Sequence, residues 1–166
     1  SSSKGDYAKA FEKFHRRLNA KGQQKLVLSR KMSAQINTGF SPLNLFCKAA
    51  ESYKDSYVYL FYTPATGFWC GSTMEVLLSG AKGRYITMSV AGTQQKKESG
   101  DVVWDVKNRN EQALVSDFIR DVLRKENCRF SESAPYTTQA GNLLHLRTDF
   151  TFENDENVLR LLASLY

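Results

Sequence analysis

The 166-residue sequence has few of the residues that build disulfide frameworks, zinc sites or membrane spans. Its three cysteines, Cys47, Cys70 and Cys128, lie far apart and form no CxxC motif, which argues against a structural zinc site and a disulfide framework. Sparse, odd-numbered cysteines are typical of a reducing cytosol, so we expect a cytoplasmic location. No apolar run reaches the length that crosses a bilayer and no signal-peptide pattern opens the chain, so we expect no membrane association.

Several common functional motifs are also missing. The sequence has no glycine-rich phosphate loop, no Ser-His-Asp order and no aromatic signature of RNA binding. Lys plus Arg number 23 and Asp plus Glu 17, which gives a net charge of +6. A basic surface can attract nucleic acid, anionic lipid or a small anionic substrate. Much of the excess falls in residues 13–25, where a solvated helix face is the simpler explanation, and we expect no nucleic acid partner.

The spacing of apolar residues predicts both helices and strands. Helices are predicted over residues 6–20, 41–53, 111–125 and 154–166, with Ser41 and either Asn154 or Asp155 as N-caps. Strands are predicted over residues 25–36, 56–64, 68–79, 83–93 and, on either side of Gly141, 136–152, with a hairpin turn at 65–67 and a polar loop at 94–110.

Because hairpins and single helices join these strands, we expect an α+β (mixed α/β) fold with mainly antiparallel sheets. The length suffices for one domain with a real core, and no linker divides residues 1–166. Residues 1–5 lack an initiator methionine and are expected to be a cloning remnant or a disordered end. The last helix has no Gly or Pro stop signal before Tyr166, so we expect this sequence to be part of a longer domain.

Two charged residues on predicted strands have both a structural and a chemical interpretation. Lys25 precedes the apolar run 26–28, where it either marks the end of an edge strand, the simpler reading, or acts as a general base. Glu75 interrupts a sequence that becomes apolar at residues 76–78. It is either a solvent-facing carboxylate on a half-buried strand or a general acid against an apolar wall. The residues alone do not choose between these readings.

Three further features are equally open. Glu111 begins the clearest predicted helix, where the helix dipole explains an acidic residue, although a carboxylate is also a ligand for Mg²⁺. One carboxylate is not a metal site. The segment 90–93, VAGT, predicts a bend in which Gly92 takes a positive φ, and such a bend also lets backbone N–H groups approach an anion. His145 is more often a satisfied, half-buried histidine than a catalyst.

The order of these pieces carries more information than any one of them. KLVLSR (25–30), GSTMEVLLS (71–79), VAGT (90–93), W-x-x-K before NEQALV (104–115) and GNLLHL (141–146) follow one another at fitting intervals. This order resembles the chorismate-utilising enzymes, which include isochorismate, salicylate, anthranilate and aminodeoxychorismate synthases. The resemblance spans about Phe14 to Tyr166, and it implies stacked, mainly antiparallel sheets flanked by helices.

Two positions sort the reactions within that family. Members that add water resemble this chain in having lysine at the position of Lys25, whereas anthranilate synthases have glutamine there. Aminodeoxychorismate synthases have a nucleophilic lysine where this chain has Ala91. The resemblance therefore implies an isochorismate synthase, and the form of residues 136–152 is most similar to those of menaquinone biosynthesis.

The resemblance also implies a role for each candidate residue. Lys25 would activate a water that attacks C2 of chorismate, and Glu75 would protonate the departing C4 hydroxyl. Glu111 would be one of the carboxylates that hold Mg²⁺ near the substrate carboxylate. The remaining candidates would bind the substrate: Ala91, Gly92, Thr93 and His145.

The sequence departs from the family pattern in two ways. Met74 replaces a usual proline before the acid, and roughly another hundred residues would follow in the family's catalytic domain. We therefore expect residues 1–166 to be the N-terminal part of that domain and to be inactive alone. A salicylate synthase and a non-catalytic module with the same fold remain alternatives, a nucleic-acid binder is a distant third, and the sequence does not indicate an oligomeric state.

Overall fold

The computed structural model describes residues 4–20, 25–96, 102–154 and 158–165. The chain divides into two compact units, Ser1–Phe40 and Ser41–Tyr166. The first contains helix α1 (Lys4–Ala20), which confirms the predicted helix, with Asp6 in its first turn and Arg17 in its last. These charges match the helix dipole. A segment without regular structure, residues 25–40, follows α1.

The predicted strand at residues 25–36 is wrong, because these residues form no helix or strand. Val27 and Met32 are 77% and 79% exposed. A strand is stable only when its backbone groups pair with another strand. Among the described residues of this unit, α1 is the only regular element. The β-branched and apolar residues here therefore have no partner strand among the described residues of the unit.

The second unit begins with a helix and a hairpin, both as predicted. Helix α2 (Pro42–Ser52) starts with proline in its first turn, and the Ser41 side chain accepts a hydrogen bond from Asn44 N at 3.2 Å. Strands β1 (Tyr57–Thr63) and β2 (Gly67–Thr73) pair in antiparallel fashion over their whole length. The second strand ends six residues before the predicted boundary, so Glu75 lies beyond the strand.

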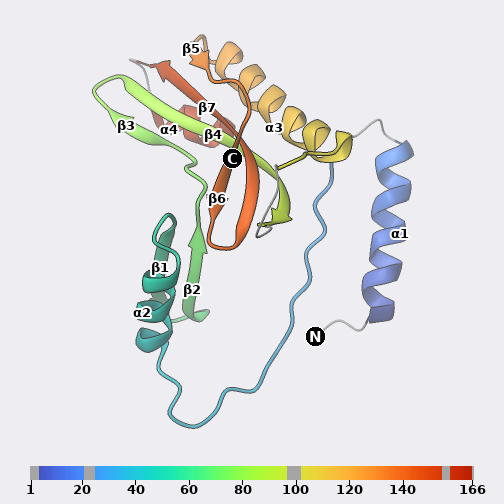
Figure 1. The fold of residues 1–166 in the computed structure, drawn as a ribbon, viewed down its shortest axis with the longest axis vertical. Helices are drawn as coiled ribbons and strands as arrows, with labels where there is room; N and C mark the ends of the chain where they lie inside the picture. Colours follow the sequence, from blue (N-terminus) through green and yellow to red (C-terminus); the bar gives the residue numbers. More distant parts are fainter. Residues whose placement is uncertain (1–3, 21–24, 97–101, 155–157, 166) are drawn as a thin grey trace. The chain divides into compact units, whose positions relative to one another are not determined.

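A five-stranded antiparallel sheet follows (Figure 1). Its strands are β3 (Ser79–Ala81), β4 (Arg84–Gln95), β5 (Arg129–Glu132), β6 (Tyr136–Ala140) and β7 (Leu143–Glu153). Strand β7 pairs with β4 along one edge, and with β5 and then β6 along the other. The α+β class and the antiparallel sheets are thereby confirmed. The short strand β5 was not predicted.

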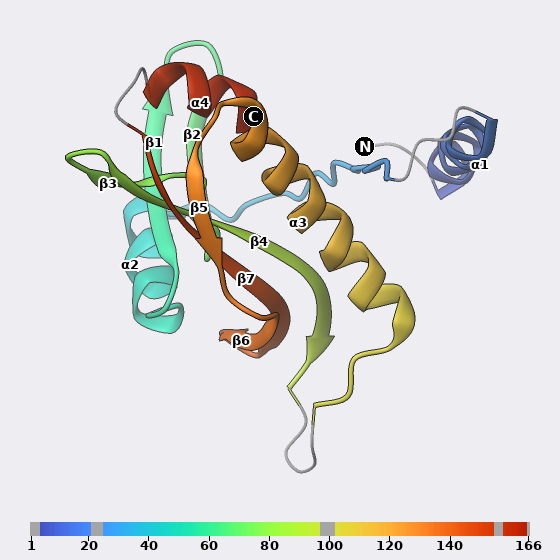
Figure 2. The same ribbon diagram turned by 90° about the horizontal axis from the view of Figure 1, so that it is seen from above.

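Helix α3 (Val106–Lys125) crosses one face of this sheet, and α4 (Val158–Leu165) packs against it (Figure 2). The predicted loop at 94–110 is wrong at both ends, because β4 continues to Gln95 and α3 begins at Val106. The reason is that Asp105 caps the helix, with its carboxylate accepting from Asn108 N at 2.7 Å. Glu111 consequently lies in the second turn and not in the first. Two residues were predicted as N-cap of the last helix. Asn154 extends the sheet, because its backbone N donates to Gly83 O. Asp155 lies outside the described residues.

The core lies between α3, α4 and one face of the sheet. Its buried members are Ile119, Val122, Leu123, Cys128, Phe150, Phe152, Leu161 and Leu165. Burial alternates along β7, so that Leu144, Leu146, Thr148, Phe150 and Phe152 face the helix side. His145, between two of them, therefore projects from the opposite face.

Candidate active site

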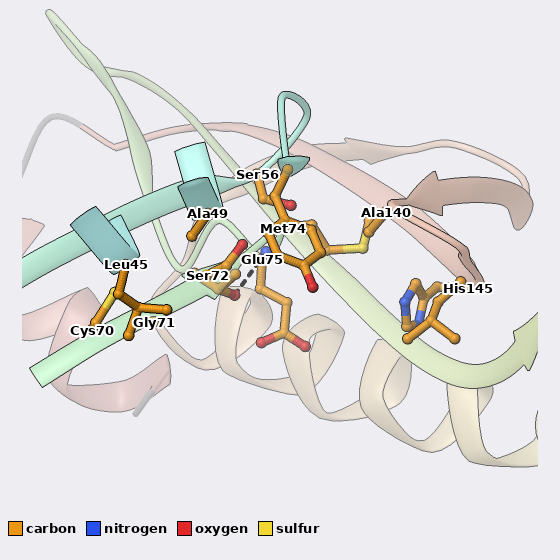
Figure 3. Close-up of a pocket in the computed structure, with 13 residues that line it drawn as sticks. Leu45, Ala49, Ser56, Cys70, Gly71, Ser72, Met74, Glu75, Ala140 and His145 are labelled. Carbon is orange, nitrogen blue, oxygen red and sulfur yellow. Dashed lines mark hydrogen bonds between the residues drawn. The ribbon is translucent and has the colours of Figure 1, made fainter. Parts of the chain in front are cut away.

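A cavity of about 530 Å³ lies between the α2–hairpin part of the second unit and the β6–β7 turn (Figure 3). It is lined by Leu45, Ala49, Tyr53, Ser56, Cys70, Gly71, Ser72, Thr73, Met74, Glu75, Ala140, Leu143 and His145. The volume is within the range of small-molecule sites. Its wall is mostly apolar, with one carboxylate, one imidazole and a few hydroxyls. Such a wall suits a compact ligand that has a ring and a small number of polar groups.

Glu75 stands where the chain leaves β2 and crosses toward β3. Its backbone N donates to Thr73 Oγ1 at 3.2 Å, and two residues later the Leu77 carbonyl accepts from Thr87 Oγ1 at 2.8 Å. These bonds hold the crossing segment against β2 and β4. The Glu75 side chain is exposed, and it also borders a second cavity of about 410 Å³ beside β4 and α3. A ligand that enters from solvent can therefore contact the Glu75 carboxylate.

His145 is held by the bend that the sequence predicted. Its Nδ1 lies 3.2 Å from Thr93 Oγ1 and 3.2 Å from the Gly92 carbonyl oxygen. When Nδ1 carries the proton it donates to that carbonyl, which leaves Nε2 as an acceptor; when it does not, it accepts from the Thr93 hydroxyl. In both tautomers the ring is oriented by residues that we expect to bind substrate.

The bend itself is a β-bulge in β4. The pairing register with β7 shifts between Ala91 and Thr93, and Gly92 has a φ of 75°. A Cβ at Gly92 would lie 3.2 Å from both Cβ and Oδ1 of Asn108, on helix α3. Glycine is therefore required for its conformation and for close packing of the helix. Ala91 and Gly92 are buried, whereas Thr93 is exposed.

Glu111 lies on α3 and is not among the residues that line the cavity. Its Oε2 accepts from Lys107 Nζ at 2.8 Å, and this hydrogen bond, with the negative charge, raises the pKa of Lys107. Among the described residues no group of three or more His, Cys, Asp or Glu side chains could hold a metal ion. One carboxylate paired with a lysine does not make a Mg²⁺ site, because that ion requires near-octahedral oxygen coordination.

Lys25 belongs to the other unit, where it is exposed in the irregular segment 25–40. Of the predicted site residues, the second unit thus brings together Glu75 and His145 at one cavity, with Gly92 and Thr93 bonded to the imidazole. Sequence reasoning missed the other walls of that cavity, such as Tyr53 and Cys70. No local signal could have found them, since α2, β2 and the β6–β7 turn meet through tertiary packing.

Comparison with known proteins gives a family and two structural neighbours. The family model described as "Chorismate binding enzyme" matches residues 1–166. No curated protein matches the sequence. One similar structure is described as the putative 2,3-dihydroxybenzoate-specific isochorismate synthase DhbC from Bacillus anthracis, with a TM-score of 0.66 and 19% identity over 76% of this chain. Another is MenF, the menaquinone-specific isochorismate synthase from Escherichia coli, with a TM-score of 0.63 and 16% identity over 74% of this chain.

Both neighbours are longer than this chain. The matched region covers 38% of the Bacillus protein and 30% of the Escherichia protein. At these identities the likeness concerns the fold. It agrees with the α+β architecture and antiparallel sheets described above. Of the described helices, none is long and apolar enough to cross a membrane.

Proposed function

Because the chain belongs to the chorismate binding enzyme family, we propose that it takes part in converting chorismate to isochorismate. The observation that carries this proposal is the pairing of Glu75 and His145 at one mostly apolar cavity, with the imidazole bonded to Thr93 and Gly92. A compact ring acid would place its ring against the apolar wall and its hydroxyl toward Glu75, the group that would protonate it. The net charge of +6 favours the approach of such an anion.

The reaction needs a proton taken from water and a proton given to a leaving hydroxyl. We assign the first step to Lys25, which would deprotonate the water that attacks C2. Glu75 would protonate the C4 hydroxyl, which then leaves as water. Water enters and water departs, so substrate and product are isomers. Proton transfers of this kind typically contribute about 10²–10⁴-fold to a rate.

His145 and the bulge supply binding and orientation. The exposed Thr93 hydroxyl and the Nε2 atom of His145 can hydrogen-bond a hydroxyl or carboxylate of the substrate. The bulge orients both groups, because the Gly92 carbonyl oxygen and Thr93 Oγ1 each lie 3.2 Å from Nδ1 of the ring and the turn packs against Asn108 of α3. A bound ring held in one orientation presents the same carbon atoms to the acid and base each time.

Glu111 would contribute one carboxylate to a Mg²⁺ site that the described residues do not complete by themselves, and the ion would neutralise negative charge on the substrate. Around Glu111 the described residues supply no cluster of three metal-binding side chains. Lysine at position 25 and alanine at position 91 favour water over ammonia as the nucleophile, following the family resemblance. We place the protein in menaquinone biosynthesis in the cytoplasm, and a salicylate synthase is the second candidate because it shares the same first step.

The test uses the natural full-length protein that contains this chain. Glu75→Gln keeps the size of the side chain and removes the acidic proton that a general acid would donate. We expect kcat for chorismate to fall by about 10²-fold or more, with little change in KM, and Lys25→Ala to do the same. Product analysis by chromatography would show isochorismate; release of salicylate with pyruvate would instead favour the second candidate.

Matched controls are available nearby. Lys31 is exposed in the same irregular segment as Lys25, and Glu51 is exposed at the end of α2. Lys31→Ala and Glu51→Gln should both retain near-normal kcat. If Glu75→Gln or Lys25→Ala also retained near-normal turnover, the assigned roles would be wrong.

A further inference from the structure

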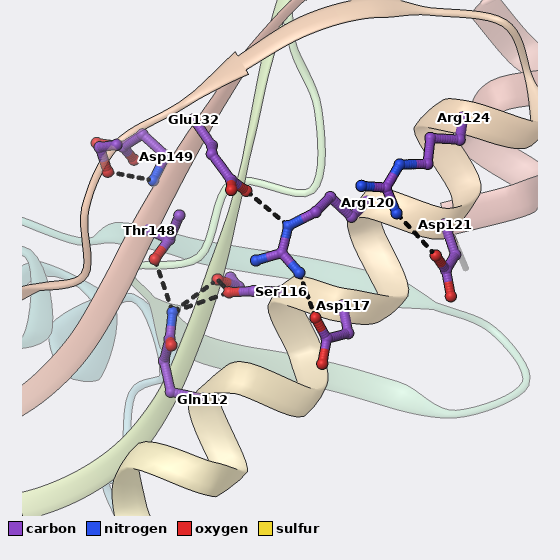
Figure 4. Close-up of polar contacts among 11 residues, drawn as sticks. Gln112, Ser116, Asp117, Arg120, Asp121, Arg124, Glu132, Thr148 and Asp149 are labelled. Carbon is purple, nitrogen blue, oxygen red and sulfur yellow. Dashed lines mark hydrogen bonds and ion pairs between the residues drawn. The ribbon is translucent and has the colours of Figure 1, made fainter.

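Four polar side chains are buried together where α3 crosses β4 and β7 (Figure 4). Gln112 and Ser116 come from the helix, Ser89 from β4 and Thr148 from β7. None is more than 3% exposed. Ser89 and Thr148 are directly opposite each other in the strand register. A single helix side chain, Gln112, therefore spans the two longest strands of the sheet.

The hydrogen bonds converge on the Gln112 amide. Its Nε2 donates to Thr148 Oγ1 at 2.8 Å and to Ser89 Oγ and Ser116 Oγ at 3.0 Å each. Ser89 Oγ and Ser116 Oγ lie 2.7 Å apart and form a further hydrogen bond. The amide has two N–H groups for three hydroxyl oxygens, so one N–H is shared between two acceptors. Ser89 and Ser116 complete the cluster by bonding to each other. This linkage fixes the rotation of every member of the cluster.

Stability alone does not explain a polar cluster at this place. Burying amides and hydroxyls carries a desolvation cost that their hydrogen bonds offset only approximately. Well-packed apolar side chains of the same size would hold the helix on the sheet about as firmly. They would lack directionality, however, and would permit small rotations and shifts of α3. The hydrogen-bonded cluster therefore specifies one position and one rotation of α3 on the sheet.

That setting matters for the residues on either side of Gln112. Asn108, one turn earlier, packs against Gly92 in the space that a larger side chain at that position would need. The position of α3 therefore determines what the bulge packs against. Glu111 is the preceding residue on the helix. A displacement of α3 would move both the bulge, with its bonds to His145, and the Glu111 carboxylate.

We propose that Gln112 is a positioning residue for the chorismate site: by bonding to Ser89, Ser116 and Thr148 it sets α3 against β4 and so fixes the geometry of the Gly92–Thr93–His145 bend. This inference rests on the function proposed above. It assigns Gln112 no contact with substrate. Its effect should appear mainly in substrate binding, since the bend supplies binding groups.

The experiment compares two variants of the natural full-length protein. Gln112→Met removes the amide and leaves three buried hydroxyls without it, so we expect a lower melting temperature and a KM for chorismate raised by about tenfold or more. The second variant combines Gln112→Met with Ser89→Ala, Ser116→Ala and Thr148→Val, which makes the whole cluster apolar. We expect it to regain most of the melting temperature while KM stays raised. Calorimetry should show the same loss of chorismate affinity.

Arg120→Met is the matched control. Arg120 Nε donates to Glu132 Oε2 at 2.9 Å and ties a later turn of α3 to β5, away from the bend. It should lower the melting temperature and leave KM unchanged. An apolar cluster variant with normal KM, or an equal rise of KM in Arg120→Met, would overturn the positioning role alone. Wild-type protein that does not bind chorismate would overturn the proposed function as well.

Discussion

At the scale of single residues, the bulge in β4 shows how one glycine joins a strand, a helix and a histidine. The sequence predicted a positive φ at Gly92, and its φ of 75° confirms this. It did not predict that Asn108 would lie where the side chain is missing. Backbone conformation can be inferred from a short motif, because φ is a local property. The neighbour across the fold cannot.

The two demands on Gly92 can be separated by substitution. Gly67 has a φ of 78°, and a Cβ added there would have nothing within 4 Å, so Gly67→Ala meets only the conformational penalty, about 1–2 kcal/mol. Gly92→Ala meets that penalty and the contact with Asn108. We expect it to lower the free energy of unfolding by about 1 kcal/mol more than Gly67→Ala, measured by urea denaturation. Equal losses would show that α3 yields to the added methyl group.

At the scale of elements, α3 illustrates how a boundary is decided by its cap. Apolar periodicity located residues 111–125 correctly, but the helix begins five residues earlier, at Val106. The signal was present in Asp105, whose residue type is favoured at N-caps. It was hidden by the polar residues of the first turn, which resemble a loop. Asp105 also places Glu111 and Gln112 by fixing where the helical turns start.

The cap is open to a direct test. Asp105→Ala removes the acceptor for Asn108 N and should lower the free energy of unfolding by about 1 kcal/mol. Asp105→Asn keeps an oxygen at the same place and should lose only a few tenths, because it forfeits just the charge that faces the helix dipole. Chemical denaturation measures both. A loss in Asp105→Asn as large as in Asp105→Ala would mean that charge, and not the hydrogen bond, stabilises this end.

At the scale of the whole second unit, β7 is the central strand of the five-stranded sheet. It pairs with three strands, and its helix-facing side chains enter both buried apolar clusters. Phe150 is fully buried at its centre, in tilted contact with Phe130 of β5. The apolar residues of α3 are buried to unequal extents, since Ile119 is buried and Phe118 is 50% exposed. Tertiary packing therefore gives very different burial to residues of the same type in the sequence.

This difference in burial predicts that the same substitution lowers the free energy of unfolding by different amounts at the two positions. Phe150→Ala leaves a cavity at the centre of the core and should lower the free energy of unfolding by about 3–5 kcal/mol. That is a large part of the stability of an ordinary domain. Phe118→Ala should lower it by less than about 1 kcal/mol, because much of its ring is already in water. Thermal denaturation of the two variants side by side decides the matter, and comparable losses would contradict the described burial.

The sequence by itself determined the local features of this protein: the class of the fold, most helices and strands, the glycine at the bulge, and the ordered motifs that belong to a chorismate binding enzyme. These follow from residue type and from periods of two or 3.6 residues, which depend on near neighbours along the chain. Only the tertiary structure decided which distant residues meet. It brought Glu75 and His145 to one cavity, and it buried Gln112 of α3 against the paired strands β4 and β7. It also gave residues 25–36 no partner strand within the described part of their unit, since pairing depends on a neighbour that local sequence does not specify.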